Sequence, residues 1–69
     1  MPRIDHLNSF CKIVELQSFS SAADMLGVTQ SAISQQIKSL EEEYGTELLH
    51  RGGNKITPTE DGNLIYRYA

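Results

Sequence analysis

The chain has 69 residues, which is enough for one domain with a small hydrophobic core. Six Lys and Arg residues oppose nine Asp and Glu residues, so the net charge at pH 7 is −3, whereas a nucleic-acid-binding domain is expected to be basic. The single cysteine, Cys11, excludes an internal disulfide and is expected to pack as a small hydrophobe. No apolar segment approaches the roughly 20 residues of a membrane span. We therefore expect a cytoplasmic protein without membrane contact.

Three helices are predicted in the first two thirds of the chain, and the spacing of apolar residues predicts the first over residues 4–16. A second is expected over residues 21–26 with Ser20 as its N-cap, and it ends at Gly27, a residue type that favours the left-handed conformation after a helix. A third follows over residues 30–44, capped by Thr29 and ended by Gly45. Their core-facing stripes contain Phe19, Ala22, Ala23 and Leu26 in the second helix, and Ile33, Ile37, Leu40 and Tyr44 in the third.

The polar face of the third helix is typical of a helix-turn-helix that reads DNA in the major groove. A solvated face normally carries mixed charge and strong helix formers, but this one carries short hydroxyl and amide side chains. Such groups can pair with base edges, since Gln can bond adenine through two hydrogen bonds and Ser can donate or accept. The residues predicted to read bases are Gln30, Ser31, Ser34 and Gln35.

A β-hairpin and a fourth helix are predicted after the third helix. Residues 48–51 and 55–58 flank the sequence Gly52-Gly53-Asn54, and a hairpin directly after a recognition helix is a wing. Pro58-Thr59 is expected to end the second strand and to cap the fourth helix, which carries an apolar stripe that is expected to pair two copies of the chain. This stripe contains Leu64, Ile65 and Tyr68. The expected fold class is mainly α, a winged helix-turn-helix with a three-helix core, a small hairpin and the start of a fourth linker helix.

The distribution of charge agrees with this interpretation in part. No acid occurs between Leu26 and Leu40 or between Leu48 and Thr59. Glu41, Glu42 and Glu43 would repel the DNA backbone, so they are expected to point away from it or to lie beyond its edge. The residues predicted to hold the DNA backbone are Ser20, Ser21, Thr29, Lys38, Arg51 and Lys55. For Arg51 and Lys55 the alternative is an ordinary surface position. Because so few cations imply weak binding to random DNA, a second copy should be needed.

Other functions find little support in the sequence. His6 and His50 have no partner at metal-ligand spacing, so we expect no metal site, and no nucleophile, Walker loop or dinucleotide motif predicts an enzyme or a cofactor. The alternative from another class is a winged helix that acts as a protein-interaction or dimerisation module without DNA binding. A scaffold paired through the fourth helix is a second alternative. The acidic balance of the chain would suit an interaction module.

The chain resembles the N-terminal DNA-binding region of LysR-type transcriptional regulators. The matching motifs are Leu7-x-x-Phe10-x-x-x-Val14, Ser18-Phe19-Ser20-x-Ala22-Ala23-x-x-Leu26, Val28-Thr29-Gln30-Ser31-Ala32-Ile33-Ser34-x-Gln36-Ile37-x-x-Leu40-Glu41, Leu48-x-x-Arg51 and Thr59-x-x-Gly62. The departures are Ser31 for Pro, Gln35 for a basic residue, Pro58 for Leu and Asp61 for Ala.

The resemblance implies a division into a winged helix-turn-helix over residues 1–58 and the start of a linker and dimerisation helix over residues 59–69. It implies a homodimer, or a higher oligomer of the full-length protein, bound to a pseudo-palindromic operator in double-stranded DNA. A small-molecule effector is expected to act only through a C-terminal effector domain, which this sequence lacks.

Overall fold

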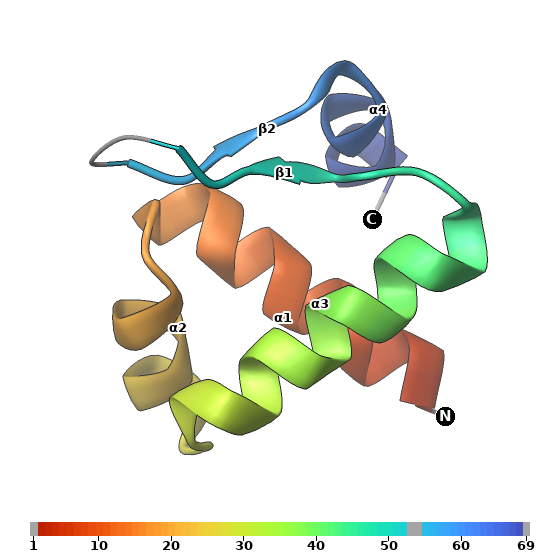
Figure 1. Cartoon of the computed structure of the whole chain (residues 1–69). Coiled ribbons are helices and arrows are strands. Elements are labelled where there is room, and N and C mark those ends of the chain that lie inside the picture. The colour runs from red at the N-terminus through yellow and green to blue at the C-terminus, as the bar shows by residue number, and fades with distance from the viewer. Residues whose placement is uncertain (1, 53–54, 69) are drawn as a thin grey trace.

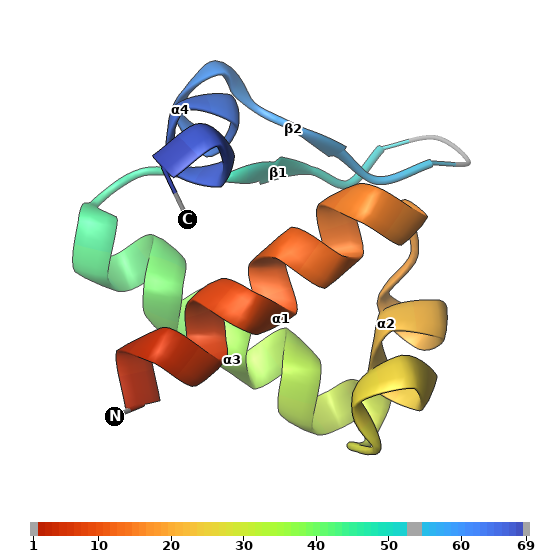
Figure 2. The same cartoon turned by 180° about the vertical axis from the view of Figure 1, so that it is seen from behind.

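The computed structural model describes residues 2–52 and 55–68, with side chains from residue 5 onward. Within these residues the elements in chain order are α1 (Pro2–Leu16), α2 (Phe19–Leu26), α3 (Gln30–Tyr44), β1 (Leu49–His50), β2 (Thr57–Pro58) and α4 (Glu60–Tyr68). The helices α1, α2 and α3 form one unit, and the hairpin and α4 lie along one side of it (Figure 1). Seen from behind, α1 crosses in front of α3 (Figure 2). This mainly helical architecture with a small antiparallel sheet confirms the expected fold class.

The core lies between the three helices and the strand β1. Its buried hydrophobic residues are Phe10, Ile13, Ala22, Ala23, Ile33, Ile37, Leu40, Leu48 and Leu49. Burying a large apolar side chain contributes about 1.5–3 kcal/mol, so these residues supply most of the driving force for folding. A buried hydroxyl, that of Ser9 in α1, donates a hydrogen bond to Oε1 of Gln36 in α3 and satisfies the polar group there.

The predicted stripes are wrong at their last residues. Tyr44 is 45% exposed and Leu26 is 38% exposed, although both were expected in the core. Each occupies the last position of its helix, directly before a glycine at which the chain turns. Helix ends project beyond the elements that cover the middle of the helix, so apolar side chains there are only partly enclosed.

The boundaries of the helices follow from local hydrogen bonds. Gly27 and Gly45 adopt the left-handed conformation, with φ of 72° and 71°, which confirms both predicted helix ends. The hydroxyl of Thr29 accepts a hydrogen bond from the amide of Ala32 at 3.0 Å, as expected of an N-cap. The prediction of Ser20 as the cap of α2 is wrong, because the Oγ atom of Ser18 accepts from the amide of Ser21 at 3.0 Å.

The earlier start of α2 has its origin in the connection from α1. Gln17 has a positive φ of 56°, so the chain changes direction immediately after α1. Ser18 is then extended, with φ of −160° and ψ of 128°, the backbone conformation of an N-cap. The helix therefore begins at Phe19 rather than at residue 21.

The hairpin is shorter than predicted. Leu49 lies opposite Pro58, and His50 lies opposite Thr57, so each strand has two residues instead of four. Proline has no N–H group to donate, so the ladder cannot continue through Pro58 as a regular strand. The predicted turn residues Gly53 and Asn54 lie outside the described residues.

Thr59 joins the hairpin to α4. Its amide donates to the carbonyl of Leu48 at 3.0 Å, and its hydroxyl donates to the carbonyl of Glu47 at 2.8 Å. The same hydroxyl accepts from the amide of Gly62 at 3.0 Å, so Thr59 caps the helix, as predicted. Gly62 is buried, and a Cβ atom at this position would lie 2.0 Å from the carbonyl oxygen of Leu48. The first turn of α4 thus rests on the backbone that leads into β1.

A second hydrogen bond ties α4 to the segment after α3. The hydroxyl of Thr46 donates to Oδ2 of Asp61 at 2.9 Å. Asp61 is the position where the resemblance leads one to expect alanine, so this hydrogen bond is a feature of the present sequence. None of the helices in the described part of the chain has the length and apolar character to cross a membrane.

Candidate nucleic-acid interface

The face of α3 that points away from the core carries the predicted base-reading residues. Ile33, Ile37 and Leu40 are fully buried, so the helix is held with its opposite side toward solvent. Gln30, Ser31, Ser34 and Gln35 are all exposed in the N-terminal half of the helix. The structure brings these four side chains to one end of one helix, where they form a surface with hydrogen-bonding groups but no formal charge. Their contact with bases remains a prediction.

Three hydroxyl residues were predicted to hold the DNA backbone, and they lie at the starts of α2 and α3. Ser20 and Ser21 occupy the first turn of α2 and are exposed, as is Thr29 before α3. Because Ser18 is the cap, the Ser20 hydroxyl is not needed for capping. The start of a helix carries a partial positive charge, which favours an anion such as phosphate.

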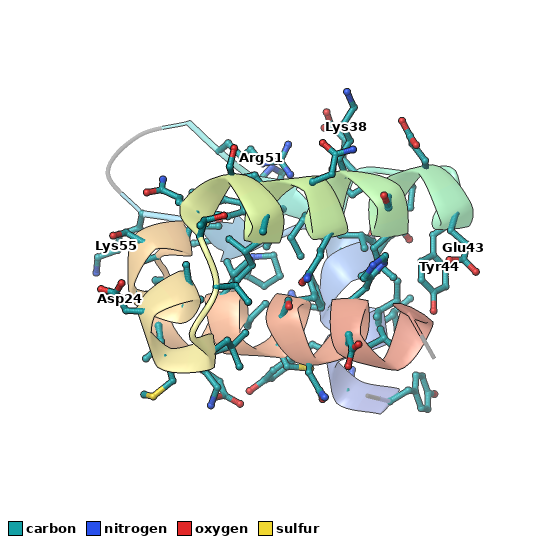
Figure 3. The ribbon with its side chains drawn as sticks, turned by 90° about the horizontal axis from the view of Figure 1, so that it is seen from below. Asp24, Lys38, Glu43, Tyr44, Arg51 and Lys55 are labelled. Atoms are coloured by element: carbon teal, nitrogen blue, oxygen red, sulfur yellow. The ribbon has the colours of Figure 1, made fainter. Side chains whose placement is uncertain are left out.

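The predicted cations do not form one cluster. Lys38 and Arg51 line a groove of about 480 Å³ between α3, the start of α2 and the residue that follows β1. Ser34, Glu41 and Phe19 line the same groove. Lys55 is exposed and lies well away from Lys38 (Figure 3). Lys38 and Arg51 therefore share one groove, and Lys55 lies at a separate position.

Arg51 is not a free surface cation. Its Nη2 atom donates to Oε1 of Glu41 at 3.1 Å, and its Cζ atom lies 5.6 Å from the centre of the Phe19 ring. The side chain is still 46% exposed. A guanidinium has five N–H donors, so donors remain for a phosphate beside the one that Glu41 accepts.

Glu41 is set apart from its two acidic neighbours, because it lines the groove that holds Lys38 and Arg51. Its carboxylate turns toward the wing, where Oε2 accepts hydrogen bonds from the amides of Leu48 at 2.8 Å and Leu49 at 3.4 Å. The side chain is only 12% exposed, in contrast to the exposed Glu42. The contacts of Glu41 with the wing could not be predicted from its neighbours, because Glu41 stands in a run of three acids. The one signal in the sequence was the position of Glu41 at the end of the motif shared with LysR-type regulators.

The fourth helix presents a second surface, formed mainly by apolar side chains. Leu64 is 48% exposed and Tyr68 is 87% exposed, but Ile65 is half-buried against the core and belongs only partly to the predicted stripe. With Leu7 and Tyr44 these residues line a groove of about 250 Å³. Tyr44 lies at the C-terminal end of α3, far from Lys55 (Figure 3). This apolar groove is therefore distant from the N-terminal half of α3.

The His, Cys, Asp and Glu residues of the described part of the chain are spread apart rather than gathered at a metal site. No group of three or more His, Cys, Asp and Glu residues there is arranged to hold a metal ion. Cys11 is half-buried against the core, and burial raises the pKa of its thiol. The negative charge of Glu15 raises this pKa further, while Lys12 opposes the shift.

Comparison with known proteins identifies the family. Residues 4–63 match the family model described as bacterial regulatory helix-turn-helix protein, lysR family. The chain is 47% identical over 64 residues to the HTH-type transcriptional regulator BenM of Acinetobacter baylyi. This alignment covers 93% of this chain and 21% of BenM. It is 43% identical over 63 residues to the nitrogen assimilation regulatory protein nac of Klebsiella aerogenes, which covers 91% of this chain and 21% of that protein.

The structural comparison agrees with the sequence comparison. A crystal structure of the BenM DNA-binding domain in complex with catB site 1 DNA superposes with a TM-score of 0.91 at 45% sequence identity. The match covers 94% of this chain and 72% of the BenM chain in that structure. The chain spans about a fifth of the length of these full-length regulators. It belongs to the lysR family of bacterial regulatory helix-turn-helix proteins.

Proposed function

We propose that this chain binds double-stranded DNA sequence-specifically as the DNA-binding domain of a LysR-type transcriptional regulator. In this proposal the N-terminal half of α3 enters the major groove, and the wing contacts the backbone or the minor groove. The observation that carries the proposal is the exposed, acid-free surface formed by Gln30, Ser31, Ser34 and Gln35. The DNA complex of the similar BenM domain supports it. As bacterial DNA is cytoplasmic, the protein would act there.

Specificity and general affinity are assigned to different residues. Gln30, Ser34 and Gln35 would read bases with help from Ser31, and each well-formed contact discriminates against a wrong base by about 1–3 kcal/mol. A contact to phosphate contributes about equally to the binding of every DNA sequence, so its loss weakens binding to all of them by a similar factor. The residues proposed for this role are Ser20, Ser21, Thr29, Lys38, Arg51 and Lys55.

We further propose that two copies bind a pseudo-palindromic operator. The apolar groove with the exposed Leu64 and Tyr68 supports pairing through α4, with Ile65 behind them. Two-fold pairs of helix-turn-helix domains read half-sites about 34–36 Å apart, one turn of the duplex. Sensing of a small-molecule effector, and a higher oligomer, would belong to the remainder of a full-length regulator.

The test compares Gln35→Ala with Lys55→Ala on a site selected from a random DNA pool and on random DNA. Gln35→Ala should weaken binding to the selected site and leave random DNA nearly unaffected, whereas Lys55→Ala should weaken both by a similar factor. If Gln35→Ala weakens both equally, Gln35 does not read a base. An affinity that does not fall steeply with salt would favour a protein-interaction module, because binding to DNA releases counterions.

A further inference from the structure

Glu41 is an acid within the groove that the proposed function places against DNA. It shares this groove with Lys38 and Arg51. A carboxylate near phosphates repels them, so on charge alone this position opposes binding. Glu41 is nevertheless well enclosed, and both of its carboxylate oxygens accept hydrogen bonds from the β1 region. Its position therefore calls for a role that outweighs the repulsion.

The two oxygens of Glu41 hold two different groups. Oε2 accepts from the backbone amides of Leu48 and Leu49, which lead into the wing. Oε1 accepts from the guanidinium of Arg51, which also lies over the ring of Phe19 in α2. Arg51 is thereby held between α2 and α3, although its backbone belongs to the wing.

We infer that Glu41 is a positioning residue for DNA binding, which holds Arg51 in the orientation that meets a phosphate. A long arginine side chain loses rotamer freedom when it binds, and a side chain that is already held loses less. The half-exposed guanidinium keeps further N–H donors for the phosphate. This inference rests on the proposed function, and it concerns orientation rather than a further cation.

The opposed effects of charge and orientation make the inference testable. Affinity for a short random-sequence duplex is measured by fluorescence anisotropy at a series of salt concentrations. The variants are Glu41→Gln, Arg51→Gln, the double variant, and Glu42→Gln as the control for removal of one negative charge from the same helix. Glutamine can still accept from the two amides, so Glu41→Gln retains the wing contact but loses the ion pair. Thermal melting establishes which variants are folded at the assay temperature.

Glu42→Gln should bind more tightly than the original chain, because it removes only charge. Glu41→Gln should bind roughly two- to fivefold more weakly, despite the same change in charge. This loss of affinity corresponds to the free energy of one exposed ion pair. Its salt dependence should lose about 0.9 from the slope of log affinity against log salt, equivalent to one phosphate. In the Arg51→Gln background the Glu41→Gln change should produce no further loss.

Tighter binding by Glu41→Gln, like that of Glu42→Gln, would overturn the inference but leave DNA binding intact. An equal loss in the Arg51→Gln background would also overturn it, because Glu41 would then act independently of Arg51. If Glu41→Gln is unfolded, Phe19→Leu is measured instead, because it removes the second contact of the Arg51 guanidinium. The same change in the slope of log affinity against log salt is expected. No salt dependence in the original chain would instead refute the proposed function, and the inference with it.

Discussion

Replacing Gly62 with alanine tests how closely α4 is packed against the wing. In an exposed helix this change would stabilise the fold by about 0.5–1 kcal/mol, because alanine is the better helix former. Here the new Cβ atom would lie 2.0 Å from the carbonyl oxygen of Leu48 and 3.3 Å from the Cβ atom of Pro58. The backbone must therefore move by about 1 Å, at the 1–3 kcal/mol typical of overpacking. That movement also disturbs the 3.0 Å hydrogen bond from the Thr59 amide to the same oxygen, at about 0.5–1.5 kcal/mol.

The clash and the lost hydrogen bond outweigh the helix propensity, so Gly62→Ala should destabilise the chain by about 1–3 kcal/mol. In a domain of this size the melting temperature should fall by roughly 5–20 °C. The assay is urea and thermal denaturation followed by circular dichroism. Asn63→Ala, at an exposed position of the same helix, is the matched control and should leave stability equal or slightly higher. A Gly62→Ala chain as stable as the original would refute the close approach of α4 to the carbonyl of Leu48.

Two further predictions concern the surface of α4 and the cysteine. Tyr68→Ala should shift the proposed dimer toward monomer in sedimentation velocity without lowering the melting temperature of the monomer, because the side chain is 87% exposed; an original chain that is monomeric at high concentration would contradict pairing through α4. Cys11 should react with iodoacetamide at pH 8 more slowly in the folded chain than in urea, since its raised pKa and burial both reduce the accessible thiolate. Equal labelling rates would disprove the burial of Cys11. Because the pKa of the thiol is raised in the folded state, the protonated thiol contributes to the free energy of unfolding at neutral pH, and this contribution is lost as the pH rises through the pKa of the folded state.

Much of the fold could be predicted because its determinants are local. Thr29 caps α3 through an amide three residues away, and Gly27 and Gly45 end their helices through their own backbone conformation. The periodic apolar residues in the middle of each helix then determine which side faces the core. The exposed face of Gln30, Ser31, Ser34 and Gln35 follows from the same periodicity. These features depend on interactions within about one helical turn, so the sequence by itself contains them.

Other features depended on which elements come together in space. In the sequence Glu41 belongs to an acidic run and Arg51 to a wing. Their ion pair spans ten residues and depends on the return of the backbone at Leu48 and Leu49 to the Glu41 carboxylate. Tyr44 continues a regular apolar stripe, yet it is partly exposed because it stands at the end of α3. The cap at Ser18 depends on the positive φ of Gln17. Sequence periodicity determined which faces are apolar, and tertiary packing decided which side chains are covered and which charges are paired, because both depend on neighbours distant in the chain.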